Sequence, residues 1–377
     1  MHELLEQIQV VKDRIKKPKK AVVTAGMPYA NGPLHIGHLA GAHVPADIYS
    51  RWLKMLIGKE NVLFVCGTDD HGSTSEVAAK NSNVSIHDFI ENIHTQQEKT
   101  LSAYSIDLDT YSGTSKKDNL EFHEKYCQDF LRALYENKFL SRKTTEQWFD
   151  PEIKMFLPDR YVYGQCPNEK CTNEKAYSEE CDVCGAQYDP RELQSPKSTV
   201  SEGAPILKDT DHWWLDMWKV GDQLREWIES KKKVWRKNVY LETINTVMPS
   251  FIFSNQHEET FKRIKESLPS HKSRYAPGKK IVVQFENISD LEKGRMIFAQ
   301  NKIVIELDDA WAHRSITRDV KWGIPVPTDK DSEMKDKSLY VWPESLIAPI
   351  SFTYSALKNK GLDPETYLDF WTDPESK

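Results

Sequence analysis

The sequence lacks any run of about 18 apolar residues, which is the length that a membrane-spanning helix needs. Its charged opening, KDRIKKPKK (12–20), has no apolar stretch behind it, so a secretory signal is not supported either. These absences predict a cytoplasmic protein with no membrane partner. We expect residues 1–19 to form a basic amphipathic helix or a frayed terminus.

The chain also lacks an excess of positive charge. Its formal net charge is −6 over 377 residues, so the overall charge gives no reason to expect nucleic-acid binding. Any contact with RNA would have to be local. The length allows two or three domains, and 11 tryptophans and 15 tyrosines indicate well-filled cores rather than disorder.

Cysteine is scarce, and its distribution is uneven. The chain has six cysteines, and four of them follow the spacing C-x4-C-x9-C-x2-C. Four thiolates at such spacing suit a tetrahedral structural Zn²⁺ with no open position for catalysis. The alternative is a reduced cluster that holds no metal. The predicted ligands are Cys166, Cys171, Cys181 and Cys184. We expect Cys66 and Cys127 to be buried apolar residues.

Strand-like and helix-like segments alternate from residue 20 to about 115. AVVTA (21–25) and NVLFVCG (61–67) are typical of strands, and a helical pattern follows each of them. Ser85 is the expected N-cap of the second helix. This alternation predicts βαβ units and a parallel sheet, hence an α/β fold. A further helix is expected within residues 116–140.

The later part of the chain has a different character. Residues 141–210 are rich in Cys, Pro, Glu and Lys and show little periodicity, which indicates an inserted, loop-rich unit. Residues 249–307 are expected to form a small α+β unit with a helix at HEETFKRIKESL and strands at IVVQF and IVIEL. SLYVW (338–342) is again typical of a strand.

Two histidines, His35 and His38, lie where the first strand has ended and a helix begins. The apolar residues expected to form the buried stripe of that helix are Leu39, Ile48, Trp52 and Leu56. A helix N-terminus offers unpaired N–H groups and a partial positive charge, which suit a phosphate. Two imidazoles there can donate hydrogen bonds to phosphate oxygens as charge builds up in a transition state. The simpler alternative is that the pair only caps the helix.

Six motifs, in this order along the chain, resemble the catalytic region of methionyl-tRNA synthetases, which are class I aminoacyl-tRNA synthetases. They are PYANGPLHIGH (28–38), FVCGTDDHG (64–72), MFLPDR (155–160), CDVCG (181–185), SITRDVKWGIPVP (315–327) and YVW (340–342). The resemblance covers residues 20–245 and 303–377. It implies a Rossmann-type nucleotide-binding fold that is split by a connective-peptide insertion with a zinc knuckle.

The resemblance also implies a domain organisation. The expected parts are the first portion of the catalytic domain (1–140), the connective-peptide domain (141–248) with its zinc knuckle (166–184), an extra α+β insertion (249–307) and the return to the catalytic domain (308–377). The chain ends before the family's KMSKS region and its anticodon-binding domain, so we expect both to be absent. A partner chain or domain could supply the missing half of the nucleotide fold.

The activity that the resemblance implies is that of a ligase, in which ATP, with Mg²⁺, reacts with an amino acid to give an aminoacyl adenylate and pyrophosphate. By position, His35 and His38 would contact the ATP phosphates, and Gly37 would leave room for the adenine. Asp69 would pair with the α-ammonium group of the amino acid, and Arg318 would hold the activated carboxylate or phosphate. The side-chain pocket would be lined by Met27, Tyr29 and Trp342. Asp69 follows a parallel strand at its carboxyl end, where ligand crevices form, although an ordinary loop is the alternative.

Part of the chain departs from the family pattern. After Trp342 it reads PESLIAPIS, so Pro349 stands where a pocket tyrosine is expected and Leu346 where a proline is expected. These changes favour a paralogue that does not strongly prefer methionine and whose acceptor is tRNA, a carrier protein or a small amine, including an N-hydroxylated one. Two alternatives remain open, an authentic methionyl-tRNA synthetase that lacks its C-terminal half and a non-catalytic binding module.

Overall fold

The fold is that of a computed structural model, which describes residues 17–177, 180–186, 188–276, 279–309 and 311–377. The helix or frayed end expected for residues 1–19 therefore lies almost wholly outside the described residues. The chain divides into two compact units. The first comprises residues up to Ala133, Thr144–His212 and Thr317–Lys377, and the second comprises Leu134–Lys143 and Trp213–Ile316.

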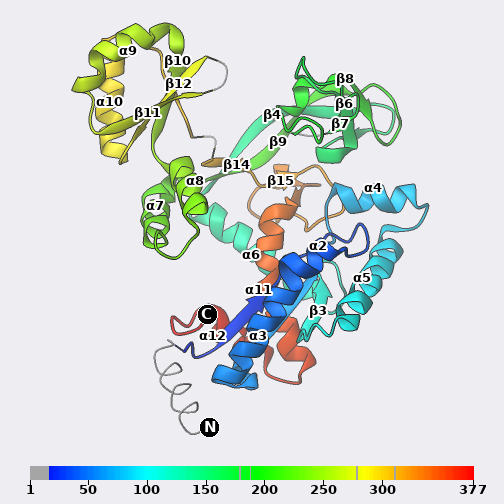
Figure 1. The fold of residues 1–377 in the computed structure, drawn as a ribbon. Helices are drawn as coiled ribbons and strands as arrows, with labels where there is room; N and C mark the ends of the chain where they lie inside the picture. The colour runs from blue at the N-terminus through cyan, green and yellow to red at the C-terminus, as the bar shows by residue number, and fades with distance from the viewer. Residues whose placement is uncertain (1–16, 178–179, 187, 277–278, 310) are drawn as a thin grey trace. The chain divides into compact units, whose positions relative to one another are not determined.

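A parallel sheet of three strands forms the base of the first unit (Figure 1). Its order is β1 (Ala21–Thr24), β2 (Val62–Thr68) and β3 (Thr110–Gly113), with Ala21 opposite Val62. Every residue of β2 is buried, as a central strand covered on both faces requires. The predicted α/β fold and parallel sheet are confirmed.

Helices join and cover these strands. Their bounds are α2 (Ile36–His38), α3 (Val44–Ile57), α4 (Ser73–Asn81), α5 (Ile86–Ala103), α6 (Leu120–Glu136), α11 (Val341–Asn359) and α12 (Tyr367–Trp371). Ser85 caps α5 as predicted, because its side chain accepts a hydrogen bond from the Asp88 amide. Helix α11 packs on β2, where Gly67 leaves room for the Phe352 ring; a Cβ at residue 67 would lie 2.6 Å from that ring.

The buried stripe predicted for the helix after Gly37 is partly wrong. A π-helical turn, Leu39–His43, separates α2 from α3 and shifts the phase of the following helix. Leu39 is buried as expected, but Ile48 is 63% exposed and Trp52 is exposed. The residues that are buried instead are His43, Asp47, Ser50 and Leu53. Three of these four side chains are polar, so an apolar pattern could not find them.

The segment from β4 to β9 contains the cysteine-rich region. Its strands are β4 (Leu140–Asp150), β5 (Met155–Phe156), β6 (Val162–Gln165), β7 (Ala176–Tyr177), β8 (Gln194–Ser198) and β9 (Ile206–Asp216). Strands β7, β6 and β8 form a small antiparallel sheet, and a separate apolar core that includes Leu157, Tyr161 and Leu193 lies beside it. Strands β4 and β9 continue into the second unit.

The second unit contains a complete α+β fold. Its elements are β10 (Ser250–Ser254), α9 (Glu258–Ile264), β11 (His271–Ala276), β12 (Lys280–Phe285), α10 (Ile288–Gln300) and β13 (Glu306–Leu307). The sheet is antiparallel, in the order β11-β12-β10-β13, and Phe251, Phe285 and Phe298 fill the core beneath its helices. The predicted helix and the strand at IVVQF are present, whereas only the last two residues of IVIEL form a strand. The unit also holds α7 (Gly221–Ser230), α8 (Lys237–Val247) and β14 (His313–Ser315).

The strand predicted at SLYVW is wrong in its second half. Strand β16 (Ser338–Leu339) pairs with β15 (Thr317–Arg318), and α11 then begins at Val341. Trp342 thus lies in the first turn of a helix. Pro343 follows it and is tolerated there, because a first-turn residue has no intrahelical use for an N–H group.

Candidate functional site

The two histidines of the first motif lie at the start of α2, and their rings stack with centroids 3.8 Å apart. His35 Nδ1 accepts a hydrogen bond from the Gly37 amide at 3.1 Å, and His38 Nδ1 accepts one from the His35 amide at 3.2 Å. Because each Nδ1 is an acceptor, the ring proton of each neutral imidazole lies on Nε2. The pair therefore caps the helix and still keeps one N–H donor per ring.

Gly37 has a role in this arrangement. A Cβ at residue 37 would lie 2.9 Å from Cε1 of the His35 ring, closer than side-chain atoms approach one another. Glycine thus allows His35 to fold back over the helix N-terminus. Partial burial, and then the neighbouring His35, lower the pKa of His38.

Residues from two strands meet where β1 and β2 end. The Asp69 amide donates to the Pro28 carbonyl at 2.9 Å, and the Ala30 amide donates to the Asp69 carbonyl at 3.1 Å. Tyr29 and Asp69 form a parallel bridge, so the chain places Tyr29 directly beside Asp69. Met27 lies at the edge of the apolar core under α11, and the Tyr29 side chain is exposed.

Asp69 is almost fully enclosed. Its Oδ1 atom is buried and has no hydrogen-bond partner among the described residues. Burial, then the charges of Glu344 and Asp70, raise the pKa of Asp69 to about 8. An uncompensated buried carboxylate is unfavourable, and a cation that entered beside it would restore the ionised form.

A buried network of hydrogen bonds lies behind Asp69. His71 Nδ1 is 2.6 Å from Glu344 Oε1, and His123 Nε2 is 3.2 Å from the same oxygen. His123 Nδ1 is in turn 3.0 Å from Ser351 Oγ. All four side chains are buried, and they come from the β2–α4 loop, from α6 and from α11.

The charges of this network stabilise one another. Burial alone would raise the pKa of Glu344, but His71 and His123 hold it at about 2. Burial lowers the pKa of His71, but the charge of Glu344, its hydrogen bond and the charges of Asp70 and Asp69 together outweigh burial, so the His71 pKa is raised. Glu344 and His71 therefore form a buried ion pair, and Oε2 of Glu344 has no partner in the described part of the chain.

Trp322 closes this region from another side. Its indole N–H donates to the Asp70 carbonyl at 2.7 Å, and its ring meets the His71 ring edge-on at 5.0 Å. The Asp70 carboxylate accepts hydrogen bonds from the amide and the hydroxyl of Ser115, both at 2.8 Å. The loop that carries Asp69 is thus fixed on both flanks.

Sequence reasoning missed Glu344, His123 and Trp322 as members of the site. Trp322 lies within the motif SITRDVKWGIPVP, and Glu344 comes two residues after the motif YVW. Their closeness to these motifs was the signal that could have pointed to them. His123 lies on a helix that gave no sign of function, and only the fold brings it to Glu344.

Arg318, Tyr340 and Trp342 form a stack near the start of α11. The Arg318 guanidinium lies 3.7 Å from the Tyr340 ring centroid, and the Tyr340 and Trp342 rings are nearly parallel with centroids 6.3 Å apart. Trp342 is 64% exposed, and Leu346, one helical turn on, is 81% exposed. Trp342 precedes Glu344 by two residues in α11, but its side chain is exposed whereas that of Glu344 is buried, so the two point to different sides of the helix.

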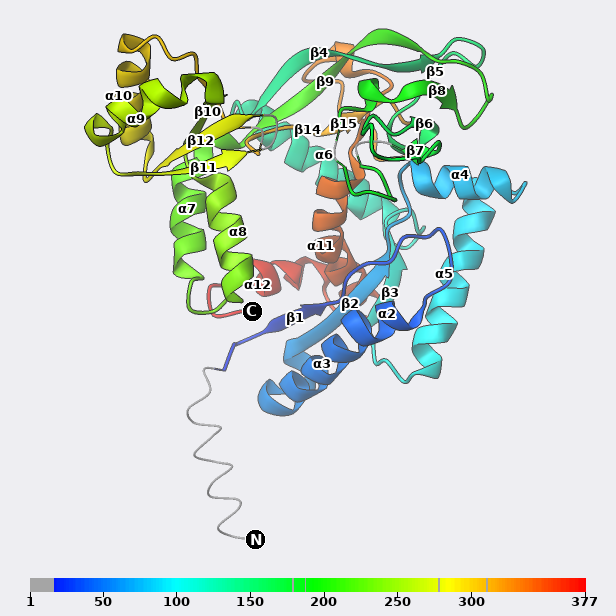
Figure 2. The same cartoon turned by 45° about the horizontal axis from the view of Figure 1, so that its top comes forward.

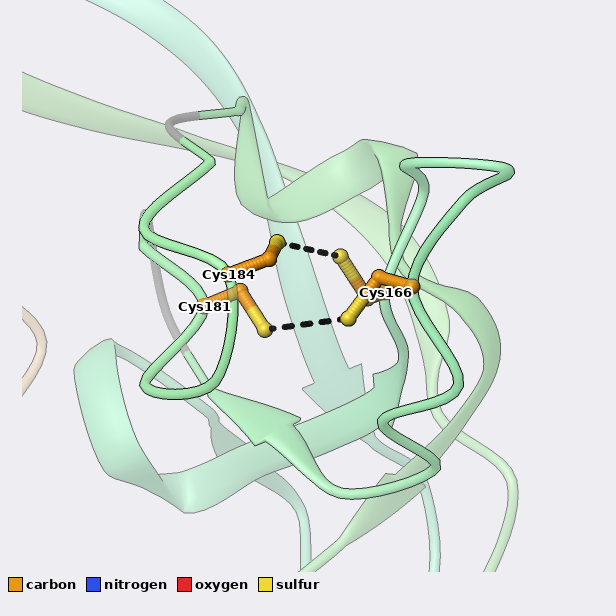
Figure 3. A group of neighbouring side chains, drawn as sticks. Cys166, Cys181 and Cys184 are labelled. Carbon is orange, nitrogen blue, oxygen red and sulfur yellow. Dashed lines mark hydrogen bonds between the residues drawn. The ribbon is translucent and has the colours of Figure 1, made fainter.

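The four predicted zinc ligands converge as a cluster. Figure 3 shows thiols from two loops that point toward one another, and the four sulfur atoms lie within 4.8 Å of each other. The Cys166–Cys184 and Cys171–Cys181 Sγ distances are both 3.8 Å. Four sulfurs around a tetrahedral Zn²⁺ at about 2.3 Å would be about 3.8 Å apart, so the donor set fits this metal.

No helix in the described residues is long and apolar enough to cross a membrane.

Curated relatives named methionine–tRNA ligase are 34% identical over 362 residues (Bacteroides fragilis) and 33% identical over 359 residues (Parabacteroides distasonis). These matches cover 96% and 95% of this chain but 42% of each relative, so the chain spans less than half of their length.

Solved structures share the fold at low identity. The Mycobacterium tuberculosis methionyl-tRNA synthetase bound by methionyl-adenylate matches 89% of this chain and 47% of its own, with a TM-score of 0.50 and 14% identity. The LeuRS of Agrobacterium radiobacter K84, in a ternary complex with tRNA and LeuAMS, matches 93% of this chain and 58% of its own, with the same TM-score and identity.

The family model described as "tRNA synthetases class I (M)" matches residues 21–255 and 289–377. The internal gap in this match, residues 256–288, runs from just before α9 to the first residue of α10 in the second unit. Because the matched residues make up most of the chain, the chain belongs to the class I tRNA synthetases of this group.

Proposed function

We propose that the chain carries the amino-acid-activating site of a methionyl-tRNA-synthetase-type ligase. In this reaction an oxygen of the amino acid's carboxylate attacks the α-phosphorus of ATP. A carboxyl–phosphate bond forms, the bond to the β-phosphate side breaks, and pyrophosphate leaves. Mg²⁺ that accompanies ATP would neutralise part of the phosphate charge.

The observation that carries the proposal is the enclosed carboxylate of Asp69 beside Tyr29. An α-ammonium group has three N–H donors and a positive charge, which are what Asp69 Oδ1 lacks. With the ammonium held there, the amino acid's side chain would extend toward Met27 and Trp342. Binding in one orientation accounts for much of the rate gain in such a two-substrate step.

His35 and His38 are the proposed phosphate ligands. Each ring presents an Nε2–H donor while its Nδ1 is engaged, so neither ring has to reorient as the charge on the phosphates develops. Arg318 is the proposed ligand of the activated carboxylate or phosphate. Its guanidinium lies 3.7 Å from the Tyr340 ring centroid, and this contact would orient its N–H groups in advance.

The acceptor of the aminoacyl group is proposed to be tRNA, since the curated relatives are methionine–tRNA ligases. A small amine or N-hydroxylated amine is the second candidate, motivated by the departures of the sequence from the family pattern at Leu346 and Pro349. Charging of tRNA, measured beside transfer to hydroxylamine, separates the two. Nothing in the comparisons supports a separate partner chain.

We further propose that Cys166, Cys171, Cys181 and Cys184 hold a structural Zn²⁺. A site with four protein ligands supplies folding energy and no open position, so the metal takes no part in the activation step.

Amino-acid-dependent exchange of labelled pyrophosphate into ATP tests the activation reaction directly. We expect exchange with the wild-type chain and its loss in Asp69→Asn. Asp129→Asn, on the exposed side of α6, is the matched control and should exchange normally. If the wild-type chain shows no exchange with any of the twenty amino acids, the proposed function is wrong.

A further inference from the structure

The turn between α7 and α8 concentrates positive charge in a chain that is acidic overall. Five of its seven residues from 231 to 237 are cations. They are Lys231, Lys232, Lys233, Arg236 and Lys237. In the described part of the chain none of the five has an ion pair, and all but the half-buried Lys231 are exposed.

The hairpin that carries this turn is a rigid support. Helices α7 and α8 lie side by side, and the turn is at the end away from the sheet of β10–β12 (Figure 2). Ile228, Tyr240 and Ile244 form a buried core between the two helices. The Tyr240 hydroxyl donates to Glu229 at 2.7 Å, which ties the two helices together near the turn.

Aromatic rings accompany the cations. Trp227 is half exposed, and Trp235 meets it edge-on with centroids 5.3 Å apart. The Lys231 ammonium lies 5.4 Å from the Trp227 ring centroid. A site for single-stranded nucleic acid has two components, which are cations that follow the nucleic-acid backbone and a ring on which a base can stack.

Acidic groups on the helices limit where an anionic partner can lie. Asp222, Glu226, Glu229 and Glu242 are exposed on the helices of the hairpin, so a broad anionic surface laid along it would be repelled. The turn alone is attractive. That small area suits a single strand better than it suits a membrane plane.

We propose that the α7–α8 turn, residues 231–237 with Trp227, is a docking surface for a single-stranded segment of RNA. The cations contact the phosphates, and a base stacks on Trp227. The inference goes beyond amino-acid activation and does not depend on it, because the surface lies in the second unit whereas the proposed activation residues all belong to the first.

Fluorescence anisotropy with a labelled oligo(U) RNA and with unfractionated tRNA tests the proposal. The test variant is Lys232→Gln/Lys233→Gln/Arg236→Gln. The control variant, Lys262→Gln/Lys265→Gln/Lys293→Gln, makes the same change of charge on α9, on the turn after it and on α10. Circular dichroism and the melting temperature establish that both variants fold.

We expect the wild type and the control to bind oligo(U) alike and the test variant to bind at least about tenfold more weakly. The slope of log K against log salt should fall by about 2 in the test variant, because each contact with a single strand contributes about 0.7. Trp227→Ala should weaken binding at least about fivefold without changing that slope.

Wild-type affinity in the test variant, or no binding of either RNA by the wild type at low salt, would overturn the proposal. So would equal binding to vesicles of anionic lipid with the same dependence on the three cations. Pyrophosphate exchange, which needs no RNA, should be unchanged in the test variant. A failure of RNA docking and a failure of the proposed activation reaction are therefore read from separate assays.

Discussion

The Asp69 carboxylate should make amino-acid binding depend on pH in a defined direction. Its pKa is about 8 in the free chain, raised by burial and by the charges of Glu344 and Asp70. An ammonium group pairs with the ionised form, so binding below pH 8 has to remove a proton first. At pH 7 about one molecule in ten is ionised, which costs about 1.4 kcal/mol of binding free energy.

The expected profile follows from that fraction. The dissociation constant for the amino acid should fall about ninefold from pH 6 to pH 7 and about fivefold from pH 7 to pH 8, where the ionised fraction reaches one half. Isothermal titration calorimetry across this range, in two buffers of different ionisation enthalpy, gives both the affinity and the proton released. Up to one proton per amino acid should be released near pH 6 and about half of one at pH 8.

Asp69→Asn supplies the comparison. This variant should bind the amino acid weakly at every pH and without the steep profile, whereas Asp129→Asn should retain it. A dissociation constant that is flat between pH 6 and pH 8 in the wild type, or a steep profile that persists in Asp69→Asn, would refute the assignment of Asp69 as the ammonium ligand.

The same pKa has a consequence for stability. The folded chain keeps a proton on Asp69 between about pH 4 and pH 8, whereas the unfolded chain has lost it. The free energy of unfolding that this group contributes therefore falls as the pH rises through that window. Asp69→Asn, which carries no charge, should be more stable than the wild type at pH 8.5, by up to about 1.4 kcal/mol for each unit of the pKa shift, and urea unfolding measures the difference.

Four other outcomes are expected. Glu344→Gln leaves a buried His71 without its counter-charge and should lower the free energy of unfolding by about 3 kcal/mol at pH 7. A loss of less than about 1 kcal/mol in urea unfolding would contradict this expectation. His35→Ala should slow pyrophosphate exchange at least about tenfold with little change in amino-acid affinity, because its contact with phosphate strengthens in the transition state. Metal analysis should find about one zinc per chain, and a strong chelator, or Cys181→Ser, should lower the melting temperature. Methionine should not be strongly preferred in thermal-shift titrations of the twenty amino acids with ATP. Pro349 stands where the family has a pocket ring, and losing a ring should cost more binding free energy than the roughly 1–3 kcal/mol that one methylene contributes. Exclusive binding of methionine would reverse this view.

Local signals in the sequence predicted the elements that local physics decides. Strand β2 is a continuous apolar run and forms as a fully buried strand, and Ser85 caps α5 through its own side chain. The cysteine spacing predicted a cluster, and the four sulfurs do converge. In each case the residues that interact are close in the chain or share one pattern.

The errors have equally physical causes. The stripe after Gly37 failed because a π-helical turn changes the phase and because Asp47 and Ser50 are polar yet buried. Trp342 was assigned to a strand because Tyr, Val and Trp favour strands, but α11 begins at Val341 and already includes Trp342. Tertiary packing decided both positions.

The charge network behind Asp69 shows why the rest of the site could not be read from spacing. Glu344 is 273 positions from His71 and 221 from His123, so no periodicity connects them. Each of these side chains alone would be unfavourable in the interior, and only the complete set is stable. A buried set of this kind fixes the β2–α4 loop against α6 and α11, and its charges add to the effect of burial on the pKa of Asp69. The residues that tune Asp69 are therefore the same ones that hold its loop in place, and a substitution among them should change stability and the pH profile of binding together.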